Sequence, residues 1–128
     1  MSQKTLVLAA RIILGGGMVV FGLNGFLQFL PSPEMPVAGL EFLTALMRTG
    51  YFFPLLKFSE IIAGAMVLSG YLLPLGLLIL APILLQILLF HIFLAPGIEL
   101  IALPIVFVIC ELYLAQDNMD VFSPILKK

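Results

Sequence analysis

The chain contains little of the chemistry that soluble enzymes use, with one cysteine and one histidine among 128 residues. A single cysteine, Cys110, excludes an internal disulfide, a CxxC redox pair and a cysteine-based metal cluster within one chain. With His91 as the only histidine, a protein-only zinc site or a bis-histidine haem would need a second subunit. We therefore expect no metal and no intrinsic cofactor. The formal net charge of −1 gives no polyelectrolyte character, so nucleic acid is not an expected partner.

Charged residues are also scarce. They make up 10% of the chain and hydrophobic residues 62%, whereas soluble domains average about 25% and about 45–50%. A soluble protein of this size could not bury so much apolar surface. The composition predicts a small integral membrane protein whose main partner is the lipid bilayer.

Four apolar segments, each near the roughly 20 residues that a spanning helix needs, lie at about 5–29, 52–72, 74–95 and 98–116. Short joints make neighbouring helices antiparallel. Arg11 interrupts the first apolar run, so we expect a retained helix and not a cleaved signal peptide. The predicted fold is all-α: one domain, residues 1–128, forming a four-helix transmembrane bundle.

The long connection, residues 30–51, opens with prolines that favour an extended backbone: Pro31, Pro33 and Pro36. Residues 38–50 then show helical periodicity. The apolar stripe of this segment consists of Leu40, Leu43, Leu46 and Met47, and its polar face of Glu41, Thr44 and Arg48. We expect a short amphipathic helix in the membrane interface, either as a connector on lipid headgroups or as a lid over a pocket.

Positive charge predicts the orientation of the chain. With four spans, Lys4 and the terminal pair Lys127 and Lys128 lie on one side, and the long loop lies on the other. The positive-inside rule then places both termini in the cytoplasm of a bacterial-type plasma membrane.

Polar side chains from three predicted spans fall at one depth, in the outer third of the membrane. They are Asn24, Gln28, Lys57, Glu60 and His91. Residues three or four apart on a helix share a face, so Lys57 can pair with Glu60, and Asn24 lies on the same face as Gln28. Intramembrane ionisable residues are costly and suggest function. We expect an outer polar pocket that binds a ligand or a proton, roofed by the 38–50 helix.

A purely structural interpretation of these residues stays open. Lys57 can extend to the headgroups with Glu60 as its surface partner, and His91 can be an interfacial residue bonded to a carbonyl. At the opposite depth, Arg11 and Glu111 lie in the first and last spans. We expect a structural ion pair between Arg11 and Glu111. Cys110, beside Glu111 on an apolar helix, is expected to be an inert buried thiol.

Four stretches resemble the DoxX-like family of small membrane proteins: FGLNGF (21–26), TGYFFPLLKFSEIIAG (49–64), LLFHIFLAPG (88–97) and ELYLA (111–115). The resemblance covers about residues 8 to 124 and implies a four-helix membrane bundle. It marks Asn24, Lys57, Glu60, His91 and Glu111 as typical polar positions of the family, without established roles. Some members of this family are membrane subunits of quinone-reducing complexes, others are linked to oxidative-stress complexes, and more distant relatives act as membrane chaperones or cargo receptors. Fold therefore does not determine function here.

Three functions follow as hypotheses. The first is an accessory subunit of a redox complex whose outer pocket binds a quinone: His91 and Lys57 would donate hydrogen bonds, Asn24 would orient the ring, and Glu60 would relay protons. Electrons would come from a partner protein, since the chain has no redox centre of its own. The second is a membrane chaperone or structural interaction protein. The third, less favoured because of the long apolar gap between the two polar ends, is a small-solute or proton pathway. No catalytic residue is assigned, and association with further copies of the chain stays open.

Overall fold

The computed structural model describes residues 2–32 and 34–127, so Pro33 and Lys128 lie outside the described residues. The first spanning helix runs from Gln3 to Leu27. It consists of α1 (Gln3–Arg11), a π-helical segment η1 (Ile12–Gly16) and α2 (Gly17–Leu27). The other three spanning helices are α4 (Phe52–Ser69), α5 (Leu73–Phe93) and α6 (Ile98–Asp117). All four are long and apolar enough to cross a membrane, which confirms the predicted all-α class. The observed helix ends differ from the predicted ones by a few residues.

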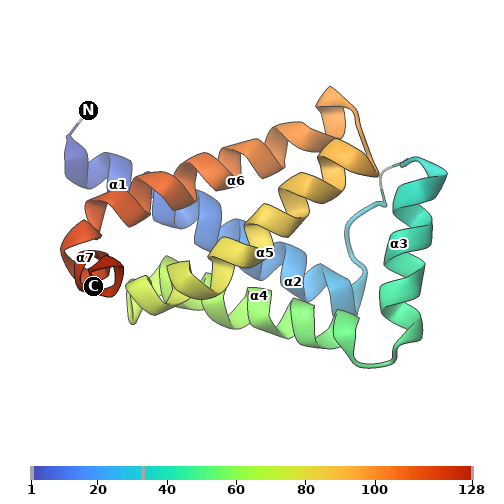
Figure 1. Cartoon of the computed structure of the whole chain (residues 1–128), viewed down its shortest axis with the longest axis horizontal. Coiled ribbons are helices and arrows are strands. Elements are labelled where there is room, and N and C mark those ends of the chain that lie inside the picture. Colours follow the sequence, from blue (N-terminus) through green and yellow to red (C-terminus); the bar gives the residue numbers. More distant parts are fainter. Residues whose placement is uncertain (1, 33, 128) are drawn as a thin grey trace.

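The four spanning helices form a closed ring of antiparallel neighbours (Figure 1). The first helix packs on α4, α4 on α5, α5 on α6, and α6 returns to α1 and η1. The core between them is apolar, with Leu14, Val67, Leu80 and Leu114 fully buried. Many other apolar side chains of the spans are exposed, Leu112 by 64% among them. Such a surface suits hydrocarbon and not water, and the protein is an integral membrane protein.

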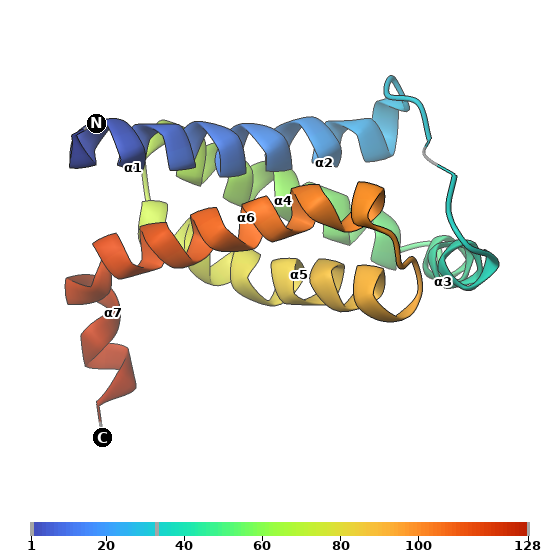
Figure 2. The same cartoon turned by 90° about the horizontal axis from the view of Figure 1, so that it is seen from above.

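Two short helices lie across the ends of the bundle. Helix α3 (Val37–Arg48) crosses the end where α2 and α5 finish and where α4 and α6 begin, as both views show (Figure 2). We call this the α3 end, and the opposite one, which holds the start of α1 and the end of α6, the terminal end. Helix α3 is the amphipathic helix expected over 38–50. It is attached to the bundle through Phe42, whose ring centroid lies 5.7 Å from that of Phe90.

Helix α7 (Met119–Leu126) lies at the terminal end and was not predicted. It turns away from the axis of α6 (Figure 2). Phe122 packs against the core, while Ile125 is 65% and Leu126 75% exposed. With eight residues it is too short to span a bilayer, and its exposed apolar side is typical of a helix in the interface plane.

Glycines set the spacing between the first helix and α4. A Cβ atom at Gly15 would lie 2.5 Å from the backbone nitrogen of Leu68, and one at Gly64 would lie 2.9 Å from the carbonyl oxygen of Gly15. Both positions therefore admit only hydrogen. Gly16 has nothing within 4 Å of the equivalent point. Small residues let helices approach closely in lipid, and Gly15 and Gly64 allow that approach here.

Candidate functional site

Lys57 and Glu60 form the ion pair that their spacing on α4 predicts. Their Nζ and Oε2 atoms are 3.2 Å apart, with the lysine side chain 19% and the glutamate 2% exposed. The contact is an ion pair by distance, but its angles are poor for a hydrogen bond and Oε2 has no other partner among the described residues. The ammonium also lies 5.4 Å from the ring centroid of Phe53, within the range of a cation–π attraction.

The stem of Lys57 lies against the backbone of α2 because Gly25 has no side chain. A Cβ atom at Gly25 would come within 2.5 Å of Cγ and 2.6 Å of Cδ of Lys57. One turn earlier, a Cβ at Gly22 would lie 3.0 Å from the carbonyl oxygen of Lys57. The two glycines therefore bring α2 onto the charged face of α4 and cover the apolar part of the lysine.

Asn24 has a local structural role. Its Oδ1 accepts a hydrogen bond of 2.8 Å from the backbone N–H of Leu30, which fixes the chain where it leaves α2. Asn24 and Gln28 were predicted to share a helical face, and they do not. Helix α2 ends at Leu27, and Gln28 is the C-cap in the left-handed conformation, with φ of 52°. The side chain of Gln28 is exposed and leaves the helix direction, so it is not part of an enclosed cluster.

His91 is bonded within its own helix. Its Nδ1 lies 2.8 Å from the carbonyl oxygen of Ile87, so Nδ1 carries the proton and donates it. Its ring also packs edge-on against Phe90, with centroids 5.2 Å apart. Among the described residues, His91 makes no hydrogen bond to Asn24, Lys57 or Glu60. The structure thus joins Lys57 to Glu60 and lays Lys57 on α2 beside Asn24. The ligand-binding role of these residues stays a prediction.

The ion pair expected between Arg11 and Glu111 is not formed, and this part of the prediction was wrong. The guanidinium of Arg11 donates from Nε to the carbonyl oxygen of Val67 at 3.1 Å and from Nη2 to that of Leu68 at 3.0 Å. These carbonyls belong to the last turn of α4, where backbone oxygens lack helical partners and the helix dipole is negative. Arg11 therefore caps α4. Glu111 is 7% exposed, and its Oε2 has no partner among the described residues.

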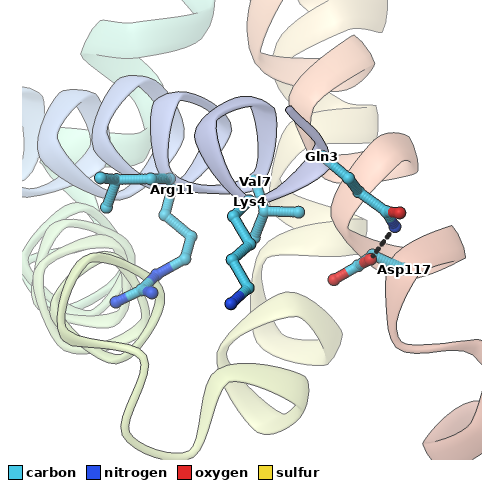
Figure 3. A pocket seen from close by; sticks show the side chains of 6 residues that line it. Gln3, Lys4, Val7, Arg11 and Asp117 are labelled. Atoms are coloured by element: carbon cyan, nitrogen blue, oxygen red, sulfur yellow. Dashed lines mark hydrogen bonds between the residues drawn. The ribbon is translucent and has the colours of Figure 1, made fainter. Parts of the chain in front are cut away.

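Two surface hollows lie away from the outer polar cluster. The larger, of about 390 Å³, is at the terminal end and is lined by Gln3, Lys4, Val7, Leu8, Arg11 and Asp117. Figure 3 shows Lys4 and Arg11 pointing from α1 toward the α4–α5 turn, and Gln3 donating to Asp117 at 3.0 Å. The smaller, of about 240 Å³, runs along α3 and is lined by Val37, Leu40, Glu41, Thr44, Ala45 and Arg48. Sequence reasoning missed the first hollow, because Asp117 follows the predicted end of the last span.

Metal binding finds no support in the part of the chain that the structure describes, where no three His, Cys, Asp or Glu side chains gather. Comparisons with protein-family models, with curated proteins and with solved structures found no match to the chain. Membership of the DoxX-like family therefore stays a prediction carried by the four stretches quoted above.

Proposed function

We propose that the chain is an accessory membrane subunit of DoxX-like type that works in a quinone-linked redox complex and is not catalytic alone. The observation that carries the proposal is the Lys57–Glu60 pair. Its glutamate side chain is buried at 2% exposure, while its lysine side chain remains 19% exposed. A partly exposed lysine in this position offers N–H donors to a polar headgroup arriving from the lipid.

The chemistry of a quinone suits this pair. A quinone carbonyl oxygen accepts a hydrogen bond from Lys57, and Glu60, in contact with Lys57, can pass a proton when the ring is reduced. Because Nδ1 of His91 donates to Ile87, Nε2 of the neutral ring is an acceptor, which suits a hydroxyl of the reduced quinone and not a quinone carbonyl. Electrons would come from a partner protein. The proposed orientation places both termini in the cytoplasm and this pair in the outer leaflet.

The test is mass spectrometry of the detergent-purified protein after organic extraction, comparing wild type with Lys57→Ala/His91→Ala. Ser59→Ala is a matched control, because among the described residues the Ser59 hydroxyl bonds only the Leu55 carbonyl of its own helix. A quinone that co-purifies with wild type and the control but not with the double variant supports the proposal. Equal quinone in all three samples, or only ordinary lipids in a well-folded wild type, rejects it.

A membrane interaction or chaperone function is the second candidate, and the bonding of Asn24 and His91 favours it. Both side chains satisfy backbone groups of their own neighbourhood, as structural residues do. Helix α3 in turn leaves Leu40 and Met47 about half exposed. Cross-linking of a co-purified membrane protein should survive Lys57→Met/Glu60→Met and be lost in Leu40→Ser/Met47→Ser. Loss in the first variant alone would contradict this function.

A further inference from the structure

Glu111 is a buried carboxyl with no partner. It lies in α6 with 7% of its surface exposed. Among the described residues its side chain makes no ion pair and no hydrogen bond, and its Oε2 is wholly enclosed. Buried polar groups are nearly always paired, so each exception calls for an explanation such as a role in chemistry or an exchangeable ligand.

The cation at the same depth is engaged elsewhere. The bonds from Arg11 to Val67 and Leu68 hold its guanidinium at the end of α4. Figure 3 shows the side chain directed to the α4–α5 turn. A Cβ atom at Gly70 would lie 2.7 Å from Nη2 of Arg11, so the left-handed glycine that ends α4 also makes room for it. Glu111 therefore has no arginine to neutralise it.

Two contacts fix the level of Glu111 along the first helix. Toward the α3 end, a Cβ atom at Gly17 would lie 2.4 Å from the ring of Phe107. At the terminal end, Gln3 bonds to Asp117. Because α6 runs antiparallel to the first helix, Glu111 lies between these contacts, level with the junction of α1 and η1. Single π-helical turns occur frequently at functional sites, and this one stands opposite the unpaired carboxyl.

The hollow of about 390 Å³ at the terminal end lies next to this level. Its lining residue Asp117 is six residues beyond Glu111 on α6, a rise of about 9 Å. Arg11, level with Glu111, also lines it. The hollow thus extends along α1 as far as Arg11, at the depth of Glu111, although Glu111 is not among its lining residues.

We propose that Glu111 is a membrane-embedded proton-binding site that exchanges its proton with water at the terminal end through this hollow. An ionised carboxylate without a partner is expensive in hydrocarbon, and the neutral acid costs much less. The charged groups lining the hollow are Lys4 and Arg11 from α1 and Asp117 from α6, and Asp120 lies in the first turn of α7. Helix α5 contributes none there, because its His91 lies at the α3 end. The site is separate from the proposed quinone contact at Lys57.

The experiment uses dicyclohexylcarbodiimide, an apolar reagent that adds to protonated carboxyl groups inside membranes. The carboxyl oxygen bonds to the carbodiimide carbon and the acid proton passes to nitrogen, so nothing leaves. An acyl shift then gives a stable N-acylurea, which mass spectrometry locates after digestion. In the reconstituted full chain, Glu111 should carry at least about ten-fold more adduct than Glu60, whose charge is paired. The adduct should decrease as the medium becomes alkaline.

Two variants test the site and its route: Glu99→Gln is a control for the labelling, and Val7→Trp tests the rate of proton exchange. Glu99→Gln removes an exposed carboxyl at the other end of α6 and should leave the labelling of Glu111 unchanged. Val7→Trp narrows the hollow. After a pH jump, the labelling of Glu111 should change several-fold more slowly in this variant and reach the same final extent. Equal adduct on Glu60 and Glu111, no adduct on Glu111 in folded protein, or labelling independent of pH overturns the proton site. An unchanged rate in Val7→Trp overturns the proposed route.

Discussion

Glu60 and Glu111 are both buried carboxyls in spanning helices, and each has a cation at its own depth, yet only one of them is paired. Lys57 lies one turn away from Glu60 on the same helix and its Nζ comes within 3.2 Å. Arg11 has to cross from another helix, and the open carbonyls at the end of α4 take it first. Equal depth therefore does not create an ion pair. Backbone carbonyls at a helix end also attract a cation, and here they bind Arg11 in place of the carboxylate.

The largest effect should come from breaking the outer pair. Lys57→Met leaves Glu60 buried without a counter-charge and should lower the free energy of unfolding by about 2–3 kcal/mol, less than for a fully buried pair because Lys57 is partly exposed. Thermal unfolding in detergent measures it. Lys57→Met/Glu60→Met should recover most of the loss. If Lys57→Met is as stable as Lys57→Met/Glu60→Met, an unpaired Glu60 costs no stability and the pair does not stabilise the fold.

The next effect concerns the close helix contact that brings Arg11 within reach of α4. Gly15→Ala places a methyl group against the backbone of Leu68 and should cost about 2 kcal/mol, since neither backbone can yield easily. Gly16→Ala, next to it in the same π-helical segment, meets open space and is the matched control in the same unfolding assay. Equal losses of stability in both variants would show that the close contact of Gly15 with α4 does not determine the effect of the substitution.

Removal of the Arg11 cap should cost less. Arg11→Met loses two hydrogen bonds from a charged group and should destabilise by about 1–2 kcal/mol, since both bonds lie near the membrane surface. A double-mutant cycle with Glu111→Met should give a coupling energy below about 0.5 kcal/mol, because the two side chains do not pair. A coupling as large as that between Lys57 and Glu60 would contradict the structure.

The smallest effect should come from Glu111 itself. Glu111→Met replaces an unpartnered carboxyl by an apolar side chain of similar length and should change stability by less than about 1 kcal/mol, in the stabilising direction. The unfolding temperatures of wild type, Glu111→Met and Lys57→Met should therefore rank Glu111→Met at or above wild type and Lys57→Met well below. A marked loss in Glu111→Met would mean that the carboxyl holds the bundle together.

The spanning helices and α3 were predictable because hydropathy and periodicity are properties of a segment by itself. The pairing of Lys57 with Glu60 was predictable for the same reason, since both lie on one helix. Partners between segments were not. The bond from Leu30 to Asn24 depends on how the loop leaves α2, and the target of Arg11 depends on where α4 ends at Gly70.

Two further features of the structure, helix α7 and the conformation of Gln28, could not be predicted from hydropathy or helical periodicity. Helix α7 is short and contains Pro124, so neither length nor apolar run marks it. Gln28 follows Asn24 by four residues, the spacing of a shared helical face, but takes the left-handed conformation that ends the helix. A side chain one residue beyond a helix end no longer follows the face that periodicity assigns to it.

The π-helical segment Ile12–Gly16 also sets how the first span can change in length. A wide turn of this kind holds one residue more than an α-helical turn, so the helix has absorbed the equivalent of a one-residue insertion. Deleting Gly16, whose surroundings are open, would restore an α-helical turn. Because four α-helical residues turn the chain by about as much as five π-helical ones, α1 would keep its rotation relative to α2. Arg11 would stay directed at the end of α4, and Asn24 and Gly25 would keep their places. The same deletion in a regular helical turn would instead rotate one half of the span by about 100°.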